Sequence, residues 1–183
     1  MSSDTTLPHD TWTDQHPGYS AESILKAATM PTGNDAGTRR HGFFVGDIAI
    51  LLPADAVCEV TDKQQICKLP GAPEWLAGMT NLRGNIVPVF DLGLLLHIAE
   101  SHDEQRAGSQ NKKQLFIEIG KEWVGFYSDG LPLPVSLDPD EISDSLPAIP
   151  EGLRPYISRC YRQQHNWLDC DIKSLLLWIG SKF

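Results

Sequence analysis

One basic side chain stands inside a strongly β-forming segment, Thr80–Leu92, whose sequence is TNLRGNIVPVFDL. This residue, Arg83, precedes the pair Gly84-Asn85, which is typical of a tight turn between two strands. The sequence therefore predicts that Arg83 lies at the end of a strand, on the rim of a sheet. A guanidinium there can hold a phosphate or carboxylate, contact another protein or form a surface salt bridge, and the segment alone leaves these alternatives open.

The residues around Arg83 favour recognition of a partner. Asn81 and Gly84 flank it as turn-forming residues, Gly78 comes earlier in the segment, and Trp75 lies on the preceding turn. Trp and Arg are enriched at the energetic centres of protein–protein interfaces. Trp75 can equally fill the interior of a small barrel. The segment thus predicts a rim with a fixed guanidinium and one candidate aromatic anchor.

Common catalytic motifs are absent from the sequence, which contains no G-x-S-x-G, no H-E-x-x-H and no G-x-x-x-x-G-K-S/T. Two groups of acidic residues could act as acid and base, but both fall in polar turns, where carboxylates stay solvated: Glu59 with Asp62, and Asp138 and Asp140 with Glu141. We therefore predict that the protein is not an enzyme.

Metal ligands are also not clustered along the chain. The cysteines, Cys58, Cys67, Cys160 and Cys170, show no C-x-x-C spacing, and no two of the six histidines are four residues apart. We expect the cysteines to be small buried thiols, and we expect neither a metal nor any other cofactor.

Composition limits the class of partner. The 183 residues carry a formal net charge of -9, which disfavours nucleic acid and anionic membrane surfaces as ligands. The hydrophobic fraction of 41% is enough to bury a core. Because there is no export signal and no apolar run of membrane-spanning length, we expect a cytosolic protein without direct membrane insertion.

Short apolar runs separated by turn residues predict a mainly β protein with little helix. Two-residue turns are expected at Gly46-Asp47, Gly84-Asn85 and Gly120-Lys121. Pro88 has no backbone N–H to donate, so the strand that contains it is expected to be an edge strand or to be bulged. An exposed edge is a place where a partner can dock.

Polar residues 98–113 divide the sequence into two similar halves. PVFDLGLLL ends the first half and WLDCDIKSLL ends the second, and in each the aspartate, Asp91 or Asp171, is expected to cap a short helix. The repeat predicts two small β-barrels, the first at about 41–97 and the second at about 114–179. Residues 1–40 are expected to form a flexible leader with one candidate short helix.

The longest motif is LPGAPEWLAGMTNLRGNIVPVFDL, Leu69–Leu92, and it resembles the motif of the CheW-like chemotaxis coupling proteins. The resemblance extends to GFFVGDIAILLP and VCEV before it and to LFIEIGKEWVGFYSDGL after it, so it covers about 42–179. The segment LPAIPEGLRPYISRCYRQQHNWLDCD is most similar to the PilI type, which serves type IV pilus chemosensory systems. LPLPVSLDP, Leu131–Pro139, departs from the family because Pro132 and Pro134 remove backbone donors.

This resemblance implies a fold of two SH3-like five-stranded β-barrel subdomains with short helices. It also implies a non-catalytic adaptor that couples a chemoreceptor to a histidine kinase and controls type IV pilus twitching motility. The implied partners are the cytoplasmic tip of the receptor and the regulatory domain of a CheA-like kinase, met in the cytoplasm at the membrane-associated receptor array. The alternative is a small-molecule or peptide-binding regulatory β-barrel with no link to a kinase.

Matching positions to the family assigns candidate site residues. Arg83, Asn81 and Gly78 match the receptor-facing rim, so that Arg83 is expected to point at a receptor helix. Val57 and Glu59 match positions that contact a partner, either the receptor or the kinase. Trp75 is the further candidate for that contact.

Overall fold

The computed structural model describes residues 38–61, 64–98 and 112–183, and over these residues the protein is mainly β, as predicted. The strands are β1 (Thr38–Val45), β2 (Ile48–Leu51), β3 (Cys58–Thr61), β4 (Leu76–Leu82), β5 (Asn85–Phe90), β6 (Lys112–Ile119), β7 (Glu122–Asp129), β8 (Leu133–Leu137), β9 (Ile142–Ser143), β10 (Ile157–Arg162) and β11 (Asn166–Cys170). The helices are α2 (Leu92–Leu96) and α3 (Ile172–Gly180), with short 3-10 helices η3 (Pro139–Glu141) and η4 (Arg154–Tyr156).

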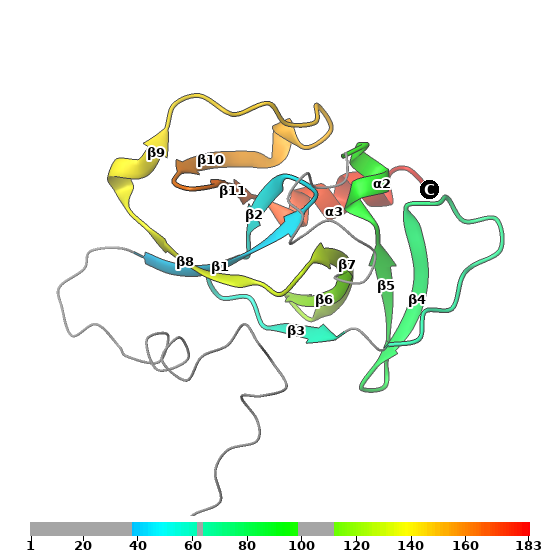
Figure 1. The fold of residues 1–183 in the computed structure, drawn as a ribbon. Coiled ribbons are helices and arrows are strands. Elements are labelled where there is room, and N and C mark those ends of the chain that lie inside the picture. Colours follow the sequence, from blue (N-terminus) through cyan, green and yellow to red (C-terminus); the bar gives the residue numbers. More distant parts are fainter. Residues whose placement is uncertain (1–37, 62–63, 99–111) are drawn as a thin grey trace, which may run out of the picture. The chain divides into compact units, whose positions relative to one another are not determined.

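The strands form two sheets (Figure 1). Sheet A has the order β8-β1-β2-β11-β10-β9, and sheet B has the order β3-β6-β7-β5-β4. Each sheet therefore combines strands from before and after residues 99–111, so the sheets do not follow the expected division at about 41–97 and 114–179. The reason is β2, which is almost wholly buried and takes β11 as a parallel neighbour on its second side, with Leu168 opposite Ile50.

Two of the three predicted turns are confirmed, at Gly46-Asp47 between β1 and β2 and at Gly120-Lys121 between β6 and β7. The third is shifted by one residue, because Leu82 pairs with Asn85 and the turn is Arg83-Gly84. Both turn residues have positive φ, 53° at Arg83 and 91° at Gly84, as a primed two-residue turn requires. Arg83 thus belongs to the turn and not to the end of the strand.

The prolines occupy positions that need no backbone donor. β5 is an interior strand and not the predicted edge, but its parallel pairing with β7 begins only at Val89, one residue after Pro88. The irregularity that we expected near Pro88 lies on the partner strand, between Leu76 and Gly78. Pro134 lies on β8, the edge strand of sheet A, where it still pairs with β1.

Both predicted helix caps are confirmed. The Leu94 N–H donates to Asp91 Oδ1 at 3.0 Å, and the Ser174 N–H donates to Asp171 Oδ1 at 3.1 Å. The two helices bury apolar faces in a core that also takes side chains from both sheets, namely Leu92, Leu95, Leu96, Ile172, Leu175 and Ile179 with Phe43, Ile50, Leu115 and Phe126. Residues 38–40, predicted as the end of the leader, instead begin β1, and the rest of the predicted leader, with its short helix, lies outside the described residues.

Candidate functional site

An ion pair joins the two outer strands of sheet B. The Arg83 guanidinium, on the turn after β4, lies 2.9 Å from Glu59 Oε2 on β3. The Arg83 side chain remains 78% exposed, whereas the Glu59 side chain is 27% exposed. An exposed pair of this kind contributes at most about 1 kcal/mol to stability. The pair therefore favours one direction of a guanidinium that stays open to solvent.

Asn81 lies beside this ion pair and shapes the turn. Its side chain is exposed, and its Oδ1 accepts a hydrogen bond from the Gly84 N–H at 2.7 Å. This bond spans the turn that contains Arg83. We call Glu59, Asn81, Arg83 and Gly84 the rim. The structure thus brings together three of the predicted site residues, Glu59, Asn81 and Arg83.

Gly78 lies within β4 and is buried beneath another backbone segment. Cys67 and Met79 exchange backbone hydrogen bonds of 2.7 and 2.9 Å, and a Cβ on Gly78 would overlap the Cys67 carbonyl oxygen. The φ of Gly78 is 142°, a value that favours glycine. The Thr80 hydroxyl also donates to the Gln65 carbonyl at 2.8 Å. Gly78 is therefore a packing residue under a covered edge and is not part of the rim.

Val57 and Trp75 have different surroundings. Val57 directly precedes β3, and its side chain is 56% exposed. Trp75 is half-buried against the main core, with its ring centroid 6.2 Å from Phe90 and 5.1 Å from Phe183. It precedes β4, whereas Arg83 follows it, and an extended strand of that length spans roughly 25 Å. The structure favours the core role for Trp75 and leaves Val57 accessible near Glu59.

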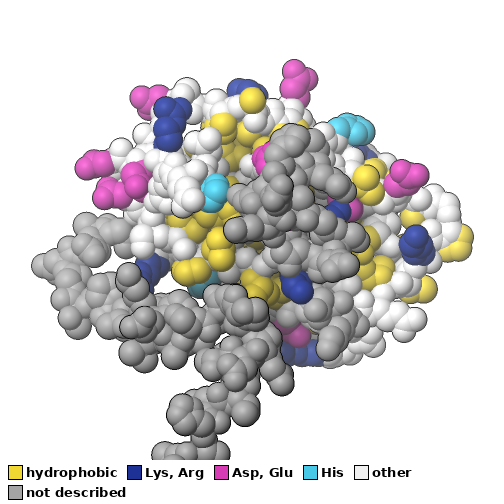
Figure 2. Space-filling view, in the orientation of Figure 1, with side chains coloured by type: hydrophobic (Ala, Val, Ile, Leu, Met, Phe, Trp, Pro, Cys, Tyr) yellow, Lys and Arg dark blue, Asp and Glu magenta, His cyan; other side chains and the backbone are white. Residues whose placement is uncertain are grey.

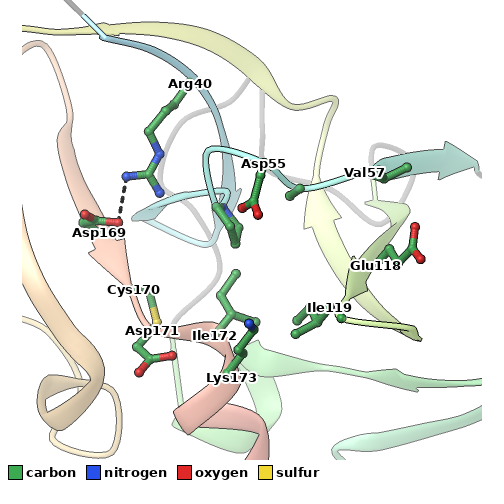
Figure 3. A pocket seen from close by; sticks show the side chains of 13 residues that line it. Arg40, Asp55, Val57, Glu118, Ile119, Asp169, Cys170, Asp171, Ile172 and Lys173 are labelled. Atoms are coloured by element: carbon green, nitrogen blue, oxygen red, sulfur yellow. Dashed lines mark hydrogen bonds and ion pairs between the residues drawn. The ribbon is translucent and has the colours of Figure 1, made fainter.

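A hollow of about 450 Å³ opens beside Val57 (Figure 3). It is lined by Arg40, Pro53, Asp55, Ala56, Val57, Glu118, Ile119, Gly120, Asp169, Cys170, Asp171, Ile172 and Lys173. Arg40 is committed to structure, because its Nη1 donates to Asp169 Oδ1 and its Nε donates to the Leu52 carbonyl, each at 2.8 Å. Arg40 was not among the predicted site residues. The first half of β1 is polar, with Thr38, Arg39 and His41 around it, so no local pattern distinguished Arg40.

Two titratable groups of this hollow, Cys170 and Asp171, have shifted pKa values. Burial, with the neighbouring carboxylates of Asp171 and Asp169, raises the pKa of Cys170 to about 12, so its thiol stays protonated near neutral pH. Hydrogen bonds from Ser174 lower the pKa of Asp171 and commit its carboxylate to capping α3. Within residues 38–61, 64–98 and 112–183, no group of three or more His, Cys, Asp and Glu side chains could hold a metal ion.

The prediction of four buried thiols is wrong for two of them. Cys160 and Cys170 are buried, but Cys58 and Cys67 are exposed. Cys58 lies on β3, an outer strand of sheet B, and Cys67 lies in the segment that covers β4. Apolar neighbours in the sequence did not imply burial there, because alternate residues of an outer strand face solvent.

On the face shown in Figure 2, acidic and basic side chains are interspersed and do not gather into one basic patch. In the described part of the chain, no helix has the length and apolar character needed to cross a membrane.

Comparison with known proteins assigns the fold to a family. The model of the CheW-like domain matches residues 41–178. Protein PilI of Pseudomonas aeruginosa is 26% identical over 127 residues, which are 69% of this chain and 68% of that protein. Chemotaxis protein CheW of Helicobacter pylori is 27% identical over 137 residues, 74% of this chain and 76% of that protein.

A solved structure supports the same fold. The crystal structure of the scaffolding protein TtCheW from Thermoanaerobacter tengcongensis superimposes with a TM-score of 0.59 at 22% identity, covering 74% of this chain and 89% of that one. The prediction of a mainly β, CheW-like fold with short helices is confirmed, and its strands lie in one six-stranded and one five-stranded sheet. The chain belongs to the CheW-like family of coupling proteins of chemosensory systems.

Proposed function

We propose that this protein is a non-catalytic adaptor that couples the cytoplasmic tip of a chemoreceptor to the regulatory domain of a CheA-like histidine kinase. The array that it serves controls type IV pilus twitching motility, and the adaptor acts in the cytoplasm at this membrane-associated array. The family match supports the coupling role, and the similarity to a protein named PilI supports the link to pili. The adaptor holds two partners in a fixed geometry, and the partners carry out sensing and phosphoryl transfer.

This proposal rests on the exposure and orientation of the Arg83 side chain. Its guanidinium is 78% exposed although it is paired with Glu59, and it belongs to the Asn-Leu-Arg-Gly sequence that matches the family. A guanidinium held in one direction at an accessible rim can form directed hydrogen bonds to a partner with little loss of side-chain entropy. We assign Arg83 to the receptor contact, with Val57 and Glu59 beside it as partner-binding residues.

The second candidate is a small-molecule or peptide-binding regulatory barrel, and the hollow beside Val57 favours it by its volume alone. Its size falls in the usual range for ligand pockets. Its lining includes six charged side chains, of which Arg40 and Asp169 are paired with each other, and such a lining differs from the mostly apolar walls of ligand pockets. We therefore rank this function below the adaptor.

The test is isothermal titration of the full chain against the helical tip of a receptor and against the kinase regulatory domain, both from the same genome. The variant Arg83→Glu reverses the charge of the rim. The matched control is Lys121→Glu, which makes the same reversal on the other exposed two-residue turn of sheet B. We expect both variants to fold, because both sites are exposed.

Loss of receptor binding in Arg83→Glu alone, with kinase binding intact in all three proteins, supports a two-surface adaptor with its receptor contact at Arg83. Equal receptor binding by both variants and the wild type contradicts the assignment of Arg83. Failure of the wild type to bind either partner contradicts the adaptor itself and favours the second candidate.

A further inference from the structure

The turn Arg83-Gly84 has a backbone conformation that an arginine rarely adopts. Its φ of 53° lies in the left-handed region, where a Cβ crowds the following carbonyl. Gly84 is not packed against other atoms, since a Cβ there would meet none within 4 Å. Besides the pairing of Leu82 with Asn85, side-chain contacts can therefore help to hold this conformation.

Two such contacts exist, and they act on different parts of the turn. Asn81 Oδ1 accepts the Gly84 N–H at 2.7 Å and so holds the backbone of the turn. Glu59 pairs with the Arg83 guanidinium at 2.9 Å and so holds the side chain. The ion pair is formed only if the turn first points Arg83 toward β3. The backbone contact is thus a condition for the side-chain contact.

We propose that Asn81 is a positioning residue, which acts on a partner through the turn and does not itself touch the partner. The inference rests on the proposed role of Arg83 and refines it, because Asn81 matched the receptor-facing rim. Its side-chain oxygen is occupied within the protein by the Gly84 N–H. By holding the turn, Asn81 raises the fraction of molecules in which Arg83 is oriented for partner binding.

This role predicts a particular size of effect. Without the Asn81 oxygen, the exposed Gly84 N–H bonds to water, so the fold survives. The turn then samples other conformations, and the apparent dissociation constant rises in inverse proportion to the competent fraction. We expect Asn81→Ala to weaken receptor-tip binding about threefold to tenfold, within the range that corresponds to losing one such hydrogen bond.

The experiment compares Asn81→Ala, Asn81→Asp and the matched control Asn85→Ala in receptor-tip titrations of the full chain. Asn81→Asp keeps the acceptor oxygen but removes the amide donors. We expect the dissociation constant of Asn81→Asp to lie within about twofold of the wild-type value. Asn85→Ala removes another exposed amide of the hairpin and should bind as the wild type does. Gly84→Ala strains the turn through its φ of 91° and leaves the Asn81 side chain in place, and it should weaken binding as Asn81→Ala does.

A second readout is the Gly84 amide proton in NMR spectra of the unbound chain. Its hydrogen exchange should be slow in the wild type and in Asn81→Asp, and fast in Asn81→Ala. Asn81→Asp also adds a negative charge, but weak binding with a slow Gly84 amide would show that holding the turn is not sufficient for recognition, which overturns the inference. Wild-type binding by Asn81→Ala, with binding lost in Arg83→Glu, overturns it and leaves the proposed function standing. Wild-type binding by all variants, Arg83→Glu included, overturns both.

Discussion

Arg40 on β1 and Asp169 on β11 form an ion pair at 2.8 Å, although they are 129 residues apart in the chain. The contact passes across β2, which lies between these strands in sheet A. The same guanidinium donates to the Leu52 carbonyl at the end of β2. One mostly buried side chain thus joins three neighbouring strands, and Figure 3 shows it above the hollow beside Val57.

Replacing Arg40 should destabilise the fold. Arg40→Ala leaves the Asp169 carboxylate and the Leu52 carbonyl without their donor, and we expect a loss of about 2 kcal/mol in the free energy of unfolding. Urea denaturation measures this loss. Arg39→Ala is the control, since the neighbouring Arg39 is exposed, and it should change stability by less than about 0.5 kcal/mol. Equal stabilities of the two variants would contradict a structural role for Arg40.

Gly78 should tolerate no side chain. In Gly78→Ala the Cβ meets the Cys67 carbonyl, which cannot move without breaking its hydrogen bond to Met79, at a backbone φ that disfavours alanine. We expect a loss of about 2 kcal/mol or more, measured by thermal unfolding. Gly71→Ala has positive φ but open space around it, so it should lose only about 1 kcal/mol. A Gly78→Ala variant with wild-type stability but weak partner binding would instead place Gly78 in the contact.

Acid should weaken the α3 cap. Because hydrogen bonds from Ser174 lower the pKa of Asp171, its ionised form is favoured in the folded state. This stabilisation is present above the unfolded pKa, about pH 4, and is lost as the pH falls through the lower folded value. Asp171→Asn keeps a capping oxygen but does not titrate, so its melting temperature should fall less than that of the wild type between pH 5 and about pH 2.5. If the melting temperatures of the two proteins fall equally over this pH range, the contribution of Asp171 is excluded.

The four thiols should differ in reactivity in the native protein. Cys67 is exposed and should react with iodoacetamide first, whereas partial desolvation raises the pKa of Cys58 and should slow it. Cys160 and Cys170 are buried and should react only in denaturant. Peptide mass spectrometry after timed alkylation assigns each site. Early modification of Cys170 would contradict its pKa of about 12 and its burial.

Local signals in the sequence predicted local structure well. The turns at Gly46-Asp47 and Gly120-Lys121 and the caps Asp91 and Asp171 depend on residues that are adjacent or three apart, so the chain nearby contains all the information. The family motif around Arg83 then supplied the fold.

Long-range pairing was not predictable in this way. The parallel pairing of β2 with β11 joins residues that are 118 apart, Ile50 and Leu168, and no turn motif in the sequence indicates it. The covered edge over Gly78 and the core position of Trp75 likewise depend on segments distant from β4 or on the C-terminal Phe183. The ion pair of Arg83 with Glu59 on β3 is a tertiary contact of the same kind.

The mixing of strands between the sheets has a consequence for the order of folding during synthesis. Sheet B needs only residues 58–129, so every strand that it contains has been made once Asp129 leaves the ribosome. Sheet A includes the first strand and also β11, so β1 and β2 must wait until Cys170 has been made. Until then, the apolar strand β2 has no strand paired with its second edge. The nascent chain therefore exposes one incomplete strand pair from Leu51 until Cys170 has been made, and a chaperone that binds extended apolar segments could bind it during that period.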